Sequence, residues 1–90
     1  MFELDEAKRR ANFLKHGVDP IEAAEIFAEF FISRIDRRTD CGEVRFAALG
    51  YVGRIAYVVI YTQRGDKIRL ISARRAGIRE IERYKNVLTR

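Results

Sequence analysis

The sequence predicts one α+β domain of two layers over residues 1–90, built from an N-terminal helical hairpin, a four-stranded antiparallel meander and a C-terminal helix. Near both ends of the chain, apolar residues recur at spacings of three and four, which is typical of amphipathic helices. In the middle they alternate with a period of two, which indicates strands. Short turn-forming stretches separate these strands, so neighbouring strands must be antiparallel. The helices then have to cover one face of the sheet.

Two helices are predicted at the start of the chain. Asp5 is a suitable N-cap for the first helix, and Gly17 is a suitable left-handed residue just beyond its end. Asp19 and Pro20 begin the second helix, whose apolar residues between positions 23 and 30 lie on one side. The short junction between the two helices makes them a helical hairpin.

Four strands are expected next, at residues 32–37, 43–49 and 54–62 and from residue 67 to an exit turn ending at residue 76. Residues 50–53 and 63–66 are the expected hairpin turns, and residues 38–42 form a polar loop. The third strand is apolar on both faces and is therefore expected to be central. A helix over residues 77–88 completes the domain, and residues 2–4 could add a short edge strand. In the last strand, strict alternation places Ile68, Leu70, Ser72 and Arg74 on one face, but a single bulge would reverse this phase.

Composition restricts the class of protein and its partners. A chain of 90 residues with 48% hydrophobic and 34% charged residues is typical of one soluble domain with a small core. The net charge of +5 points first to a polyanionic partner such as RNA or DNA. The single cysteine, Cys41, cannot form an internal disulfide, which favours the reducing cytoplasm. The longest apolar run, residues 55–61, is far shorter than the ~20 residues of a membrane helix, so no membrane partner is expected.

Cations gather where the last strand ends and the final helix begins. Arg74 is the strongest single candidate for a functional residue, because an exposed cation after an apolar strand has no packing role there. Its guanidinium, the neighbouring Arg75 and the free N–H groups of a helix start suit a phosphate or a carboxylate. The structural alternative for Arg74 is an ion pair with Glu80 or Glu82.

The candidate chemistry follows from what the sequence lacks. His16 and Cys41 are the only residues of their kinds, so neither a metal cluster nor a nucleophilic triad is expected, and no glycine-rich phosphate loop occurs. Cations remain, together with a carboxylate, an imidazole or a phenol. RNA cleavage suits this set, because the ribose 2′-OH attacks its own phosphate and the protein only moves protons and neutralises the phosphorane. No metal or other cofactor is required.

Several segments resemble the BrnT family of toxins, in order and at matching spacing over nearly the whole chain. These segments are Asp5-Glu6-Ala7-Lys8, Asn12, Lys15-His16-Gly17-Val18, Glu22-Ala23-Ala24-Glu25-Ile26-Phe27, Gly42-Glu43-Val44-Arg45, Ile71-Ser72-Ala73-Arg74-Arg75-Ala76, and Glu80 with Tyr84. The resemblance implies a RelE-like fold and a type II toxin: an endoribonuclease that inhibits translation. It also implies neutralisation by a BrnA-like antitoxin with a ribbon-helix-helix DNA-binding domain, so that DNA is contacted only through the antitoxin complex.

Roles are assigned to nine residues. Arg74, Arg45 and Arg75 are expected to stabilise the phosphate, while Glu43 or His16 moves the proton. Lys15, Arg69, Arg64 and Tyr84 are expected to contact RNA. Several of them also have a structural alternative: Lys15 and His16 complement a helix C-terminus, Glu43 and Arg45 form a cross-strand ion pair, Arg64 is a solvated residue at a hairpin tip, and Tyr84 packs in the core.

Two functions of other classes stay open from the residues alone. A non-catalytic nucleic-acid-binding module would use the same cations for backbone contacts, and its binding would depend steeply on salt without cleavage. A protein-interaction domain would present its basic face or an edge strand to a partner.

Overall fold

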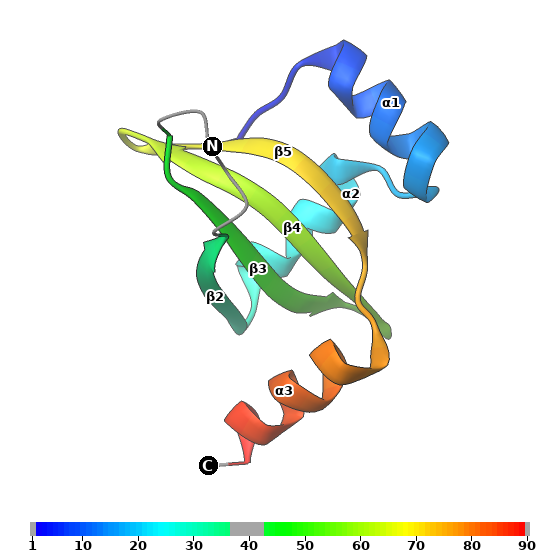
Figure 1. The fold of residues 1–90 in the computed structure, drawn as a ribbon, viewed down its shortest axis with the longest axis vertical. Helices are drawn as coiled ribbons and strands as arrows, with labels where there is room; N and C mark the ends of the chain where they lie inside the picture. Colours follow the sequence, from blue (N-terminus) through cyan, green and yellow to red (C-terminus); the bar gives the residue numbers. More distant parts are fainter. Residues whose placement is uncertain (1, 37–42, 90) are drawn as a thin grey trace.

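A computed structural model describes residues 2–36 and 43–89 of the chain, and the predicted loop at 38–42, including Cys41, lies outside these residues. The elements are β1 (Phe2–Glu3), α1 (Glu6–His16), α2 (Pro20–Ala23), the 3-10 helix η1 (Ala24–Ala28), β2 (Phe31–Asp36), β3 (Arg45–Val52), β4 (Ile55–Arg64), β5 (Lys67–Arg75) and α3 (Ile78–Leu88). The α+β class predicted from the sequence is confirmed (Figure 1).

One mixed sheet of five strands organises the chain, in the order β1-β5-β4-β3-β2. The strands β2 to β5 pair antiparallel, as the predicted meander requires. The four-stranded, purely antiparallel sheet is nevertheless wrong, because β1 adds a fifth strand parallel to β5. Phe2 lies opposite Ile68, so the first residues of the chain cover part of the outer edge of the last strand.

The first helical layer packs on one face of the sheet. Asp19 holds its two parts together, since its carboxylate accepts the Ile21 N–H at 3.0 Å and two hydrogen bonds from the Arg9 guanidinium at 2.9 and 2.7 Å. The predicted helical hairpin is only partly correct, because α2 tightens into η1 after Ala23. Ile26 in η1 is fully buried against Gly50, where a Cβ would lie 3.0 Å from the Ile26 Cβ. The absence of a side chain at Gly50 therefore lets η1 pack closely on the sheet.

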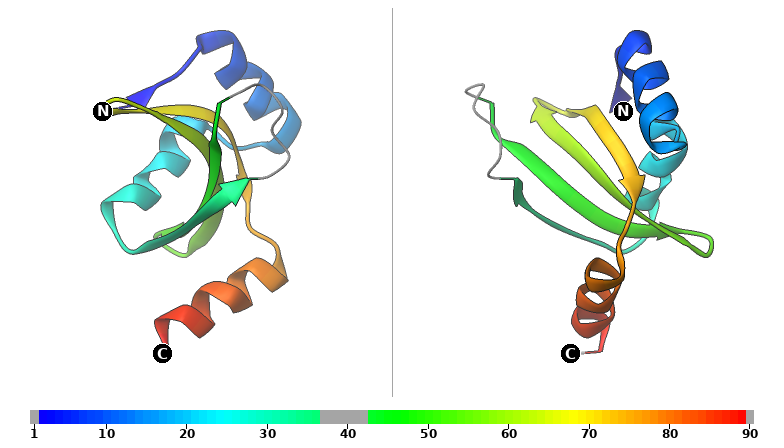
Figure 2. Two further views of the ribbon diagram at one scale, coloured as in Figure 1. Left: turned by 60° about the vertical axis from the view of Figure 1, so that its left-hand side comes forward. Right: turned by 45° about the vertical axis from the view of Figure 1, so that its right-hand side comes forward.

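The final helix takes the other face. Tyr84 of α3 is buried in a second apolar cluster with Leu49, Val58 and Ile60 of the sheet. Figure 2 shows α3 as a body separate from α1 and α2, joined to the end of β5. The expectation that all helices cover one face is therefore wrong, and a groove forms between α3 and the sheet.

A β-bulge in β5 sets which side chains face this groove. Tyr61 pairs with Leu70, but Ile60 pairs with Ser72, so Ile71 is the extra residue. The strict alternation expected from the sequence is therefore wrong: Leu70 and Ala73 lie together in the core under the first helical layer. The bulge turns Arg74, the residue after Ala73, toward the opposite face.

The hairpin turns are shorter than predicted. The strand β3 continues through Gly50 to Val52, and the turn lies at Gly53 and Arg54. Gly53 and Gly65 both adopt φ near +61°, as two-residue hairpin turns favour. Among the described residues, no helix is long and apolar enough to cross a membrane.

Candidate functional site

The candidate site is the groove between α3 and the sheet. Two adjoining cavities of about 230 and 330 Å³ share the lining residues Arg34, Ala47, Val58 and Glu80. The first cavity adds Arg83 of α3, and the second adds Arg74 of β5. These six residues and Asp36, which lines the second cavity, define the α3 groove, which has three arginines, two carboxylates and an apolar floor.

Arg74 and Glu80 form an ion pair with two parallel hydrogen bonds in the α3 groove. The Nη1 and Nη2 atoms of Arg74 donate to the two carboxylate oxygens of Glu80 at 2.9 and 2.7 Å. Glu80 also accepts the Gly77 N–H at 2.7 Å, which fixes its carboxylate at the start of α3. The ion-pair alternative for Arg74 is therefore present, and it holds the guanidinium at the groove with 41% of its side chain exposed.

The pKa values of the pair follow from this geometry. The hydrogen bonds from Arg74 lower the pKa of Glu80 to about 2, against a smaller opposing effect of burial. The Gly77 N–H and the positive charges of Arg74 and Arg34 make smaller contributions to the same lowering. The hydrogen bonds to Glu80 in turn raise the pKa of Arg74. Glu80 is thus a carboxylate and Arg74 a cation at any physiological pH.

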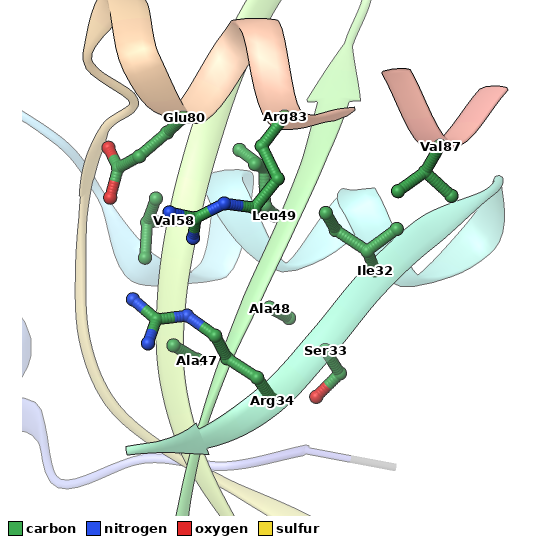
Figure 3. A pocket seen from close by; sticks show the side chains of 10 residues that line it. All are labelled: Ile32, Ser33, Arg34, Ala47, Ala48, Leu49, Val58, Glu80, Arg83 and Val87. Atoms are coloured by element: carbon green, nitrogen blue, oxygen red, sulfur yellow. The ribbon is translucent and has the colours of Figure 1, made fainter. Parts of the chain in front are cut away.

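Two further arginines complete the groove, and sequence reasoning missed both. Arg34 on β2 and Arg83 on α3 point into it, as Figure 3 shows, and neither has a hydrogen-bond or ion-pair partner among residues 2–36 and 43–89. Three guanidiniums therefore line the groove together with two carboxylates, those of Glu80 and Asp36. Arg34 could have been found from its position two residues after Ile32, on the same face of the strand, and Arg83 from its place one helical turn after Glu80.

Two further arginines, Arg45 on β3 and Arg69 on β5, form a second basic row on the same face of the sheet, near Thr62 of β4. Arg45 lies opposite Asp36, and Arg69 lies opposite Thr62. The Nε of Arg45 is buried without a hydrogen-bond partner. On β4, Val58 lies opposite Arg74 and Thr62 lies opposite Arg69. Because these two β4 residues are four positions apart, the backbones of Arg74 and Arg69 are separated by about 13 Å at ~3.3 Å per residue. The structure therefore places Arg45 in a row separate from Arg74, and their grouping at one phosphate stays a prediction.

The structure does not bring the predicted proton-transfer residues to the groove. Lys15 and His16 are exposed in the last turn of α1, which is bonded through Asn12 to the outer edge of β5, and they complement that helix end as the structural alternative predicts. Glu43 lies before β3 rather than within it, and it pairs with Arg64 at 2.8 Å instead of Arg45 or Arg69. Arg64 is therefore held in an ion pair beside the β4–β5 turn.

Two more predicted contacts with RNA lie elsewhere. Tyr84 is buried, and its hydroxyl donates to the Phe30 carbonyl at 3.1 Å, so it packs in the core. Arg75 is exposed opposite Tyr57, on the face of the first helical layer rather than the groove face. Among the described residues, no group of three or more His, Cys, Asp or Glu side chains is arranged to hold a metal ion.

Comparison with known families adds to this geometry. Residues 4–80 match the family described as ribonuclease toxin, BrnT, of type II toxin-antitoxin system. The chain belongs to the BrnT family. Its membership identifies the chain as a ribonuclease toxin of a type II toxin–antitoxin system, and it implies a protein antitoxin as partner. Among curated proteins, none matches the chain. The segment that the BrnT family shares includes both Arg74 and Glu80.

Proposed function

We propose that this BrnT protein is a metal-independent endoribonuclease that cleaves RNA in the α3 groove and thereby inhibits translation in the cytoplasm. The observation that carries the proposal is the arrangement of Arg34, Arg74 and Arg83 around one groove on the sheet face. Guanidiniums neutralise and hydrogen-bond phosphate oxygens through their planar fork, and their strength as stabilisers grows as charge develops in the transition state.

The proposed reaction is attack of the ribose 2′-oxygen on the adjacent phosphorus. The O2′–P bond forms and the P–O5′ bond breaks, leaving a 2′,3′-cyclic phosphate and a 5′-hydroxyl. Arg74 turns from Glu80 to the phosphate, where it stabilises the phosphorane together with Arg34 and Arg83. Loss of the Arg74 hydrogen bonds raises the pKa of Glu80 from about 2 toward its ordinary value, because those bonds are the largest cause of its lowering. Glu80 then takes the 2′-OH proton and returns it to the 5′-oxygen.

The test compares three proteins on an end-labelled RNA in the presence of EDTA. The unmutated chain is expected to give discrete fragments that end in 2′,3′-cyclic phosphate. Arg74→Ala is expected to reduce the cleavage rate by about 10²-fold, as loss of one transition-state donor does. Arg75→Ala is the matched control, since it removes an exposed arginine next in sequence but on the opposite face. Equal cleavage by Arg74→Ala and Arg75→Ala would refute the proposed site.

The partner in this proposal is a BrnA-like antitoxin with a ribbon-helix-helix domain, through which the complex contacts DNA. Expression of the toxin alone is expected to arrest growth, and co-expression of the antitoxin to restore it. Sustained growth with large amounts of the unmutated toxin would contradict the proposal.

A nucleic-acid-binding module is the second candidate function, and the row of Arg45 and Arg69 favours it. The unpartnered Nε of Arg45 is a buried donor of the kind that a phosphate oxygen would satisfy. This candidate predicts that RNA stays intact in EDTA with all three proteins, while binding weakens linearly with salt on a log–log plot.

A further inference from the structure

The part of the α3 groove under the later turns of α3 is an apolar slot. Ala47, Leu49 and Val58 form its floor on the sheet, Ile32 lies on the β2 side, and Val87 covers it from α3 (Figure 3). A large side chain at position 47 would occupy much of this space, so the small alanine keeps the slot open. The cavity of about 230 Å³ is smaller than the 300–1,000 Å³ pockets that hold drug-sized ligands, so it suits a single small ring system.

The polar groups of the slot stand at its mouth. The guanidiniums of Arg34 and Arg83 enter the same space, one from the sheet and one from the helix (Figure 3). Neither guanidinium has a hydrogen-bond or ion-pair partner within the described part of the chain, so their planar faces are available for stacking. Guanidinium planes stack on flat aromatic rings, and single-stranded RNA is recognised by bases that are unstacked and held in this way.

The slot also continues into the cavity that contains Arg74, because both cavities share Arg34, Ala47, Val58 and Glu80. A ligand that fills both needs a flat, largely apolar ring joined at short distance to an anionic group. A nucleotide has this composition, whereas an aliphatic side chain of a protein partner has no anion to offer the arginines.

We propose that the slot binds one nucleobase of the RNA, adjacent to the phosphate held at Arg74, with Arg34 and Arg83 stacking on the ring. This assignment rests on the proposed ribonuclease function and adds a base-binding subsite to it. Because the floor is aliphatic, the subsite recognises a base by shape and stacking.

The first test is binding of nucleoside 5′-monophosphates and of ribose 5-phosphate, followed by methyl signals in nuclear magnetic resonance. All four nucleotides probe the slot, and ribose 5-phosphate offers the anion without the base. We expect the methyl signals of Leu49, Val58 and Val87 to shift with at least one nucleotide and to stay unchanged with ribose 5-phosphate. Unchanged methyl signals with all four nucleotides would overturn the proposal. A response to an apolar peptide of the antitoxin, without one to nucleotides, would do the same.

Filling the slot supplies the matched variants. Ala47→Leu adds three carbons to the floor, and Ala28→Leu makes the same change in a separate apolar hollow on the other face of the sheet. We expect Ala47→Leu to weaken nucleotide binding about tenfold, the size of one lost base stack, and Ala28→Leu to leave it unchanged. Equal affinities of Ala47→Leu and the unmutated chain would overturn the proposal.

The second test combines the filled slot with an abasic RNA. Removing the base on one side of the cleaved phosphate is expected to slow the unmutated chain about tenfold and to add nothing to the defect of Ala47→Leu. Rapid cleavage of every abasic substrate would overturn the subsite. If the unmutated chain cleaves no RNA, the ribonuclease proposal fails, and the nucleotide titration still decides whether the slot binds a base.

Discussion

Replacing Asn12 by alanine is expected to destabilise the fold by about 3 kcal/mol. The Asn12 side chain is buried with 6% exposure and replaces a neighbouring strand along the outer edge of β5. Its amide nitrogen donates to the Ala73 carbonyl at 2.9 Å and to the Val18 carbonyl at 2.8 Å, and its oxygen accepts the Ala73 N–H at 3.0 Å. The contact joins α1 to the residue immediately before Arg74.

The magnitude follows from these three hydrogen bonds. Each contributes about 1 kcal/mol net, and alanine leaves one buried N–H and two buried carbonyls without their partner. A domain of this size has a free energy of unfolding of roughly 5–15 kcal/mol, so the loss is a large fraction. It corresponds to a fall in melting temperature of roughly 15 °C.

Urea unfolding followed by circular dichroism measures the change, and hydrogen exchange of the Ala73 amide locates it. Asn86→Ala is the matched control, because Asn86 is exposed on α3 and its loss should change stability by less than ~0.5 kcal/mol. A loss below about 1 kcal/mol for Asn12→Ala, with the Ala73 amide still protected, would refute the reasoning.

Three further predictions concern ion pairs and one glycine. Glu80→Gln should cost about 1 kcal/mol at pH 7. Because the pKa of Glu80 is lowered to about 2 in the fold, this stabilisation is present above pH 4.5 and lost as the pH falls toward 2. If the urea midpoints of Glu80→Gln and the unmutated chain still differed at pH 2, the prediction would be contradicted. Asp19→Asn keeps the side-chain cap of α2 but removes the charge paired with Arg9. Asp19→Ala removes the cap as well, so its free energy of unfolding should be about 1 kcal/mol lower than that of Asp19→Asn in thermal unfolding. An unfolding curve of Asp19→Ala equal to that of Asp19→Asn would exclude the cap. Gly17→Ala should cost about 1 kcal/mol, because Gly17 has φ of +69° with open space around it, and an unchanged melting temperature would argue against that conformation.

The sequence predicts the elements of the fold well because each has a local cause. Asp5 and Asp19 cap helices where expected, since capping depends on a few neighbouring residues. The parallel pairing of β1 and the bulge at Ile71 depend on contacts between distant segments, so no local pattern reveals them. The bulge alone decides that Arg74 faces the groove.

The candidate site was only partly predictable for the same reason. Arg74 stood out because it follows an apolar strand, and Glu80 was named as its alternative partner. Spacing alone places Arg34 on the strand face of Ile32 and Arg83 one turn after Glu80, but their meeting in one groove depends on α3 folding over the sheet. Glu43 was expected to share a strand face with Arg45, two residues later, but β3 begins only at Arg45.

The contacts of β1 and α1 with β5 have a consequence for the order in which the fold forms during synthesis. Phe2 meets Ile68, and Asn12 meets Ala73 across 61 residues, so both contacts wait for β5 to leave the ribosome. Contacts this distant in sequence also form slowly, because a long loop must close first. The α3 groove therefore exists only after β5 and α3 have both been made, and a chain that stops before β5 lacks Arg74, Glu80 and the wall that α3 provides. A toxin built this way acquires its proposed activity only after α3 has been translated.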